Sequence, residues 1–279
     1  MLYNTKRKEV DNMGKIAEKV ALVTAAAKGI GFSIAKLFAE NEATVYIADV
    51  QEELGKESVN KINENGGKAK FIKFDAFDKS SYKKMIDEIV NNEGSIDILV
   101  NNFGYTNVKK DLDLVNGEYD TFSKIVDTNL SSVYLTSKYA VPVMIKNGGG
   151  SIINISSIGS ILPDLARMAY CVSKAAINSL TENIAAQYAR FNIRCNAVLP
   201  GITGTDAVTN NMSEEFIDSF LNHIPLNRIA KPEEIAKAVL FFASEDSSYI
   251  TGHILDVAGG LGRVTPQYSD YMRASKLIK

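Results

Sequence analysis

The sequence predicts an α/β fold in which one doubly wound parallel sheet of about seven strands carries helices on both faces. Short runs rich in β-branched residues alternate with longer amphipathic segments along the chain. Most of these runs are apolar on both faces, as strands must be when helices cover both sides of their sheet. Alternation at this spacing requires crossover connections, which are right-handed in parallel sheets.

Each expected strand is a short apolar run bounded by polar residues or glycine. In chain order the expected strands are Val20–Thr24, Thr44–Asp49, Ala69–Asp75, Ile96–Asn101, Ser151–Ser156, Arg194–Leu199 and Ile254–Val257.

The connecting segments have the period of amphipathic helices and carry helix boundary signals. Helices are expected at 30–41, 51–65, 79–92, 118–146, 168–191 and 232–244. Gly66 and Gly67 end the second helix, Asp78 or Ser80 caps the third, and Pro232 opens the last with a preset φ.

The chain is expected to form a single domain over residues 13–279, preceded by a flexible, polar and aperiodic extension at 1–12. Residues 201–231 interrupt the alternation with a loop containing Gly and Asn and a short helical piece. Because ligands of such sheets bind outside the carboxyl ends of the strands, this insertion is predicted to be a lid over the site. Residues 261–279 are expected to form a C-terminal tail.

Composition excludes several classes of function. The 31 Lys and Arg residues nearly balance the 33 Asp and Glu residues, which argues against nucleic-acid binding. No apolar run reaches the roughly 18 residues of a membrane-spanning helix. Cys171 and Cys195 cannot form a disulfide framework, so the cytoplasm is the expected compartment. His223 and His253 lack metal-ligand spacing, and no metal site is predicted.

The turn from Thr24 to Gly31 predicts a dinucleotide site of the Rossmann type. Glycine in this turn lets a pyrophosphate approach backbone N–H groups at the positive end of the first helix. Many turns of this kind bind nothing, but Asp49 ends the second strand, where the ribose of the adenosine would lie.

Two charges disagree about the cofactor. Asp49 can accept hydrogen bonds from free ribose hydroxyls and would repel a 2′-phosphate, whereas Lys28 could pair with such a phosphate. A carboxylate facing a phosphate is costly, and a lysine can turn into solvent. NAD is therefore the expected cofactor, with NADP as the alternative.

Metal-free alcohol oxidation needs a side chain that takes the alcohol proton while hydride leaves for a nicotinamide. A tyrosine can do this when a nearby cation lowers its pKa, and Tyr and Lys at i, i+4 share a helix face. Of the three candidates only Tyr170 follows a strand that ends in hydroxyl residues, so its pair is favoured over the other two. An ordinary interface tyrosine stays the alternative interpretation of Tyr170. The spacing occurs at Tyr105/Lys109, Tyr134/Lys138 and Tyr170/Lys174.

From Met13 to about Gly260 the chain resembles a short-chain dehydrogenase/reductase of the classical type. Each matching motif is weak alone, but the ordered set is specific. The set comprises the glycine turn, Asp75, Asn101-Asn102-Phe103-Gly104, Asn129, Ser157, Tyr170, Lys174, and Pro200-Gly201 with Thr205.

This resemblance implies four catalytic residues. Tyr170 would be the general acid/base, and Lys174 would bind the nicotinamide ribose and lower the pKa of Tyr170. Ser157 would orient the substrate oxygen, and Asn129 would hold a water in a proton relay to Lys174.

The resemblance also implies a set of cofactor contacts. Asp75 is expected near the adenine, Asn102 near the adenosine ribose, and Ile202 and Thr205 near the carboxamide or phosphate. The full set is Thr24, Lys28, Gly29, Ile30, Gly31, Asp49, Asp75, Ala76, Asn102, Gly104, Tyr170, Lys174, Pro200, Gly201, Ile202 and Thr205.

Three residues depart from the family pattern. Ala25 replaces the first turn glycine, so the turn must keep a negative φ or accept strain. Phe103 replaces an alanine and is expected to crowd the cofactor or meet the substrate. Ala258 replaces the aspartate that commonly precedes Gly259 and Gly260.

Within the family, the chain further resembles the bacterial 7α-hydroxysteroid dehydrogenases, which oxidise the 7α-hydroxyl of bile acids. The resemblance lies in residues 101–107, 156–160, 193–201 and 265–269. A steroid needs an apolar lid with a few polar groups, for which Thr106, Asn107 and Arg167 are candidates. The apolar face that would meet the steroid, or pack on the protein instead, is made by Phe216, Ile217, Phe220, Leu221 and Ile224.

Two alternatives stay open. A 3-oxoacyl-thioester reductase of the same family is opposed by Asp49 and by the lack of a Lys/Arg cluster near the lid. A non-catalytic cofactor sensor is opposed by the intact set of four catalytic residues. The resemblance also implies a homotetramer that pairs the helices at 118–146 and 168–191.

Overall fold

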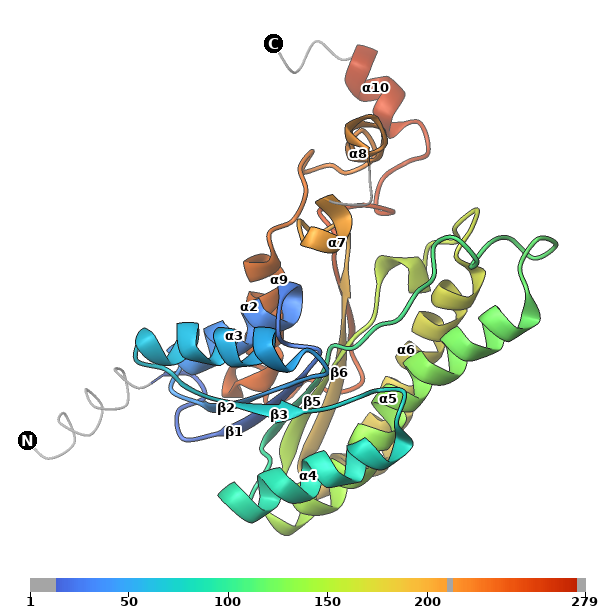
Figure 1. The fold of residues 1–279 in the computed structure, drawn as a ribbon. Helices are drawn as coiled ribbons and strands as arrows, with labels where there is room; N and C mark the ends of the chain where they lie inside the picture. The colour runs from blue at the N-terminus through green and yellow to red at the C-terminus, as the bar shows by residue number, and fades with distance from the viewer. Residues whose placement is uncertain (1–13, 210–212, 275–279) are drawn as a thin grey trace, which may run out of the picture.

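The computed structural model describes residues 14–209 and 213–274, and the predicted extension at 1–12 lies outside them. Seven parallel strands form one sheet in the order β3-β2-β1-β4-β5-β6-β7 (Figure 1). The order reverses between β1 and β4, and in sheets of this kind such a switch point places ligands at the carboxyl ends of the strands. The predicted fold class and strand number are confirmed.

Most strand boundaries fall within one residue of the prediction. The exceptions are β3, which stops before Asp75, and β4, which begins two residues later than expected. The strands are β1 Val20–Thr24, β2 Thr44–Asp49, β3 Lys68–Lys73, β4 Ile98–Asn101, β5 Gly150–Ile155, β6 Ile193–Pro200 and β7 Ile254–Val257.

The six predicted helices are all present, and three short ones accompany them. Two of these, α7 and α8, lie in the predicted lid, and α10 lies within the predicted C-terminal tail. The helices are α2 Gly29–Glu40, α3 Glu52–Glu64, α4 Lys79–Glu93, α5 Tyr119–Lys146, α6 Met168–Tyr188, α7 Asp206–Thr209, α8 Glu214–Leu221, α9 Pro232–Ala243 and α10 Tyr268–Ala274.

Boundary chemistry explains where several helices begin and end. The Asp78 carboxylate accepts the N–H of Ser80 at the start of α4, and Pro232 occupies the first turn of α9. Gly66, with a φ of 84°, follows the end of α3.

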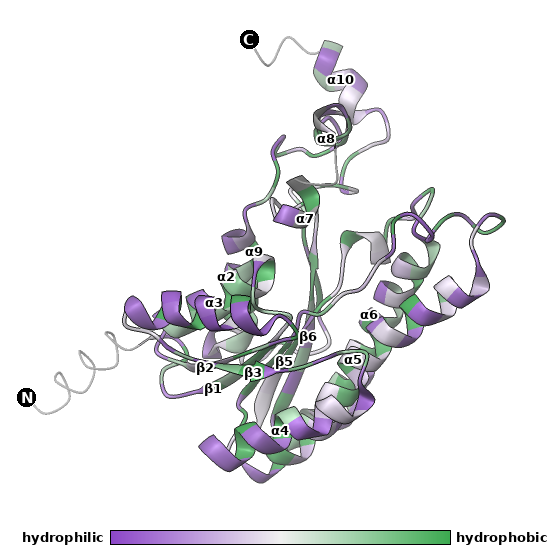
Figure 2. Cartoon of the chain, in the orientation of Figure 1, coloured by the Kyte–Doolittle hydropathy of each residue, from purple (hydrophilic) through white to green (hydrophobic). Residues whose placement is uncertain are grey.

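The sheet separates two apolar cores. On one face, α2 and α9 pack Phe38 and Phe242 against the strands. On the other, α4, α5 and α6 contribute Tyr82, Met144 and Ile184. The apolar sides of these helices turn toward the sheet and their polar sides turn away (Figure 2). No helix within the described residues is long and apolar enough to span a membrane.

A buried polar ladder fixes α5 and α6 against the centre of the sheet. The Asn101 side chain donates to Asn154 Oδ1 at 2.8 Å and accepts from Thr136 Oγ1 on α5. Asn154 in turn donates to Thr181 Oγ1 on α6 at 2.8 Å. Because buried amides must be satisfied, these bonds set the position of both helices relative to β4 and β5.

Candidate active site

The predicted site residues gather at the carboxyl edge of the sheet, on both sides of the switch point. Most of the cofactor set lies at the ends of β1, β2, β3 and β6 or just after them, while Asn102 and Gly104 follow β4 and Ser157 follows β5. Tyr170 and Lys174 lie on the first turns of α6, and Asn129 lies on α5.

The N-terminus of α2 is open to an anion. No side chain caps it, and its first turn contains no acidic residue. Gly29 has a φ of 61°, and Gly31 packs so closely that an added Cβ would lie 2.5 Å from the carbonyl oxygen of Ala25. An added Cβ on Gly29 would lie 3.5 Å from Thr205, which places the segment after β6 beside this turn. This arrangement fits a dinucleotide pyrophosphate.

Ala25, which stands where the family has the first glycine of the turn, has a strained backbone rather than a negative φ. Ala25 has a φ of 50°, in the region that favours glycine. The Asn102 side chain donates to the carbonyl oxygens of Thr24 and Ala25 at 3.1 and 2.9 Å. The Thr24 hydroxyl accepts the N–H of Asn102 at 3.0 Å. The Asn102 side chain thus braces the strained turn.

Asp49 is buried and held in one orientation. Its two carboxylate oxygens accept the N–H groups of Ala27 and Gln51, each at 3.0 Å. A carboxylate has further acceptor sites on both oxygens, so it can still receive ribose hydroxyls. Lys28 lies exposed on the same turn. The buried negative charge favours an unphosphorylated ribose.

The remaining cofactor set frames this edge of the sheet. Asp75 accepts the N–H of Phe77 at 2.9 Å, and the carbonyl oxygen of Ala76 accepts the Tyr82 hydroxyl. Gly201, after Pro200, has no room for a side chain because an added Cβ would lie 2.8 Å from Ala258. In the same segment Ile202 accepts the N–H of Ala230, and Ile30 packs on the core beneath α2.

Lys174 is buried beside Tyr170 without an acidic partner. Only 2% of Lys174 is exposed, its ammonium donates to the carbonyl oxygen of Ile155 at 2.9 Å, and it lies 5.7 Å from the centroid of the Tyr170 ring. No carboxylate within the described residues pairs with it. Burial lowers the pKa of Lys174 to about 8. An added Cβ on Gly104 would lie 3.3 Å from Nζ, so a side chain there would press on the ammonium.

Opposing effects act on the pKa of the Tyr170 hydroxyl. Burial raises the pKa of Tyr170 above its ordinary value. A hydrogen bond with Ser157 and the charge of Arg167 lower this pKa, but burial outweighs them. Ser157 also accepts the N–H of Gly159, which fixes its hydroxyl at the end of β5.

The Asn129 side chain ties the loop after β4 to the catalytic helix. Its amide exchanges two hydrogen bonds with the backbone of Tyr105, at 2.7 and 2.9 Å, and donates to Ser173 Oγ at 2.9 Å. Ser173 Oγ then donates to the carbonyl oxygen of Tyr170 at 2.7 Å. The side chain of Asn129 therefore fixes the turn that carries Tyr170.

The structure adds a residue that the sequence reasoning missed. Asp111, 3% exposed, accepts the N–H groups of Ala169 and Tyr170 at 2.8 and 3.0 Å, and so caps α6 from a distant loop. Its partners lie far away in the sequence, and no local motif marks the contact.

The segment predicted to form a lid contacts the start of the C-terminal segment. Leu226 donates its N–H to the carbonyl oxygen of Gly259, and an added Cβ on Gly259 would lie 2.8 Å from the buried Ile224. Phe216 on α8 is 52% exposed, so the apolar face of the lid is covered only in part. Phe103 packs on the second core, with its ring 6.4 Å from that of Phe77.

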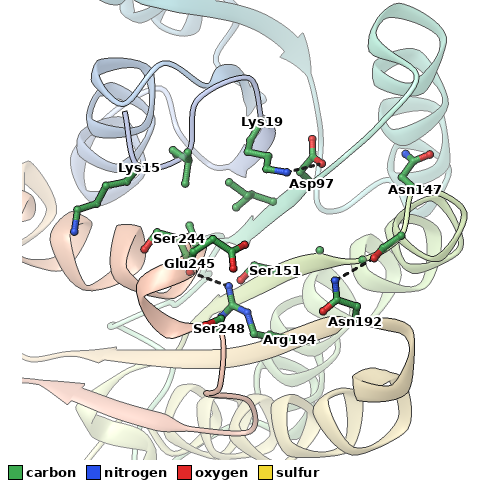
Figure 3. A pocket seen from close by; sticks show the side chains of 16 residues that line it. Lys15, Lys19, Asp97, Asn147, Ser151, Asn192, Arg194, Ser244, Glu245 and Ser248 are labelled. Atoms are coloured by element: carbon green, nitrogen blue, oxygen red, sulfur yellow. Dashed lines mark hydrogen bonds and ion pairs between the residues drawn. The ribbon is translucent and has the colours of Figure 1, made fainter. Parts of the chain in front are cut away.

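A pocket of about 190 Å³ lies at the opposite edge of the sheet, away from these residues (Figure 3). Its lining includes Lys19, Asp97 and Arg194. Lys19 pairs with Asp97 at 3.8 Å, and Arg194 donates to Ser247 Oγ and to the carbonyl oxygen of Ser244. Lys19 and Arg194 are thus both held by other groups of the protein. No cluster of potential metal ligands occurs in the described part of the chain.

Comparison with known proteins agrees with this geometry. The family model described as enoyl-(acyl carrier protein) reductase matches residues 24–262. A 7α-hydroxysteroid dehydrogenase of Clostridium sardiniense is 55% identical, covering 93% of this chain and 99% of the relative. One from Paraclostridium sordellii is 53% identical, covering 96% and 100%.

Solved structures show the same fold. A 7α-hydroxysteroid dehydrogenase in complex with NADH and 7-oxo glycochenodeoxycholic acid matches with a TM-score of 0.84 and 32% identity, covering 88% of this chain and 95% of that one. The chain belongs to the short-chain dehydrogenase/reductase family.

Proposed function

We propose that this oxidoreductase uses NAD to convert the 7α-hydroxyl of bile acids reversibly to a 7-oxo group. The observation that carries the proposal is the 55% identity to a 7α-hydroxysteroid dehydrogenase over nearly the whole of both chains. The juxtaposition of Ser157, Tyr170 and Lys174 supports the chemistry.

The side chains of the site divide the reaction between them. NAD bound at this site would supply the hydride acceptor for C7 of the bile acid. Tyr170 takes the proton of the 7α-hydroxyl in oxidation and returns it in reduction. Ser157 orients the substrate oxygen, and Lys174 binds the nicotinamide ribose and supplies positive charge beside Tyr170. Asn129 is assigned the water relay to Lys174, and its side chain also keeps the tyrosine turn in place.

The cofactor assignment rests on Asp49. Its buried carboxylate would face a 2′-phosphate but can accept ribose hydroxyls, which favours NAD over NADP. The open N-terminus of α2 would hold the pyrophosphate, with Thr205 beside it.

Exposed apolar side chains next to the site suit a rigid apolar substrate. Leu165, 95% exposed, lies two residues before Arg167, Met168 is the first residue of α6, and Phe216 and Leu226 belong to the proposed lid. A steroid covers such a surface while its hydroxyl reaches Tyr170.

A direct test follows reduced nicotinamide in four mixtures, which combine NAD or NADP with a 7α-hydroxy bile acid or its 7β epimer. Turnover confined to the 7α epimer with NAD is the expected result. Turnover with NADP alone would overturn the role of Asp49. Absence of turnover with either epimer, despite cofactor binding, would discard the bile acid and leave 3-oxoacyl thioesters as the next substrates.

We also propose a cytoplasmic homotetramer that pairs α5 and α6 across two-fold axes. Tyr134 and Ile145 on α5 and Val172 on α6 are exposed apolar side chains that such pairing would cover. Light scattering on the purified protein tests it, since a monomer would contradict the proposal.

A further inference from the structure

Arg167 has a backbone conformation that its residue type does not favour. Its φ of 58° and ψ of 40° lie in the left-handed region, where glycine and asparagine are preferred. The N–H of Arg167 donates to the carbonyl oxygen of Asp111 at 2.9 Å. A contact from outside α6 thus holds an arginine directly ahead of the turn that carries Tyr170. Strained backbone conformations of this kind are often found at functional sites, where the surrounding structure holds them in place.

The side chain of Arg167 turns toward Tyr170. The guanidinium carbon lies 5.8 Å from the centroid of the Tyr170 ring, about as close as Lys174 Nζ at 5.7 Å. Asp164 fixes the guanidinium through hydrogen bonds from Nε, at 3.0 Å, and from Nη2. One tyrosine ring is therefore approached by two cations, only one of which belongs to the Tyr/Lys motif.

The other groups around Tyr170 do not replace this charge. The Asp111 carboxylate faces the helix N-terminus and accepts the N–H of Tyr170. The Cys171 thiol, whose pKa is raised by burial, supplies no positive charge, and Ser157 is neutral. Lys174 has a pKa of about 8 and loses its charge in alkaline solution. A guanidinium stays protonated over the whole range in which a tyrosine ionises.

We propose that Arg167 is a positioning residue whose fixed positive charge stabilises the ionised hydroxyl of Tyr170. This inference rests on the proposed role of Tyr170 as acid/base. It gives a reason for an arginine at a left-handed position and for the carboxylate of Asp164 that holds it.

The test compares Arg167→Met and Arg167→Lys with a matched control, Arg273→Met. Arg273 on α10 also pairs with an aspartate three residues earlier, so the control removes the same charge and the same kind of ion pair. Two curves are measured for each protein: the pH dependence of bile-acid oxidation, and the tyrosinate absorbance against pH minus that of the same protein carrying Tyr170→Phe.

A cation lowers the pKa of a nearby tyrosine, so its removal raises that pKa. Arg167→Met is expected to move the acidic limb of the oxidation profile and the tyrosinate transition to higher pH by about half a unit or more. Arg167→Lys keeps a charge and restores most of the shift, and Arg273→Met leaves both curves in place. Asp164→Asn removes the counter-charge and moves both curves to lower pH.

Three results overturn the proposal. The first is that Arg167→Met lowers turnover without moving either curve. The second is that Arg167→Met and Asp164→Asn move the curves in the same direction. The third is that Arg167→Lys folds but shifts the curves as much as Arg167→Met does. Thermal unfolding confirms that each variant is folded. If wild-type protein fails to oxidise the bile acid, the proposed substrate fails, while the absorbance titration still tests Arg167.

Discussion

Two tyrosine–lysine pairs with the same spacing lie in different surroundings. Tyr134 and Lys138 on α5 are exposed, and the Lys138 ammonium lies 5.9 Å from the ring of Tyr139. On α6, by contrast, Lys174 is buried and lies beside Tyr170. The i, i+4 spacing brings a cation and a phenol to one helix face in both pairs. The electrostatic interaction between the two groups becomes strong only where water is excluded. The environment supplied by Gly104, Ser157 and Asp111 therefore separates the proposed catalytic pair from the accidental one.

Removing the two hydroxyls in turn is the strongest way to break this comparison. Tyr170→Phe is expected to lower turnover by about a thousandfold while NAD binding survives, because general acid/base catalysis is lost. Tyr134→Phe should leave turnover unchanged. Steady-state rates and cofactor titration check this, and comparable losses in both variants would remove the distinction.

Burial of Lys174 has a pH-dependent effect on stability. The pKa of Lys174 falls from 10.5 in the unfolded chain to about 8 in the folded protein. The folded state thus disfavours the ammonium, at a cost of up to about 3 kcal/mol below pH 8 that vanishes as the pH rises to 10.5. The folded protein is therefore least penalised above pH 10.5, and its free energy of unfolding decreases as the pH falls from 10.5 to 8.

Lys174→Met removes that cost and also a hydrogen bond worth about 1 kcal/mol. The free energy of unfolding of the variant is therefore expected to be about 2 kcal/mol higher than that of the wild type below pH 8, and this gain shrinks toward pH 10.5. The variant is also expected to be inactive. Lys138→Met is the matched control. Denaturant unfolding at a series of pH values checks this, and a gain that grows with pH would have the wrong sign.

The cap at the N-terminus of α6 can be removed while the side chains of Tyr170 and Lys174 stay unchanged. Asp111→Ala removes the acceptor for the N–H groups of Ala169 and Tyr170, and is expected to cost about 1–2 kcal/mol of stability along with turnover. Asp113→Ala in the same loop removes exposed local turn contacts with Val115 and Asn116 and should cost about 0.5 kcal/mol or less. Equal losses in unfolding experiments would contradict the assigned cap.

The smallest expected effect is on the cofactor side. Ala25→Gly relieves the left-handed strain of the turn but increases the freedom of the unfolded chain, so a net gain of about 0.5 kcal/mol is expected. Thermal unfolding checks this, with Ala27→Gly as a control that has no positive φ to relieve. A loss of stability in Ala25→Gly would show that the turn is not strained.

The two halves of the site differ in how far the sequence predicts them. The cofactor half depends on local signals, namely the turn after β1 and the acid that ends β2, and a reader of the sequence can place Gly29, Gly31 and Asp49 directly. The support of the catalytic half is made by contacts between distant segments. The capping of α6 by the Asp111 carboxylate and the approach of the Arg167 charge to Tyr170 depend on tertiary packing that no periodicity encodes.

The same reasoning explains the missed helix α10. Its seven residues are too few to form a periodic pattern that can be recognised, and a helix of this length depends on its surroundings for stability. The insertion at 201–231 is visible in the sequence as an interruption of the alternation, but its contact with Gly259 is a tertiary feature.

The most direct test of the difference between the two pairs is an NMR titration of isotope-labelled lysine side chains, with the Lys174 signal assigned by its loss in Lys174→Met. A buried ammonium without an acidic partner predicts that this signal titrates at a pKa of about 8. A Lys174 signal that titrates near the ordinary value of 10.5 would show that its charge is solvated or paired, and would contradict the account of how α6 differs from α5.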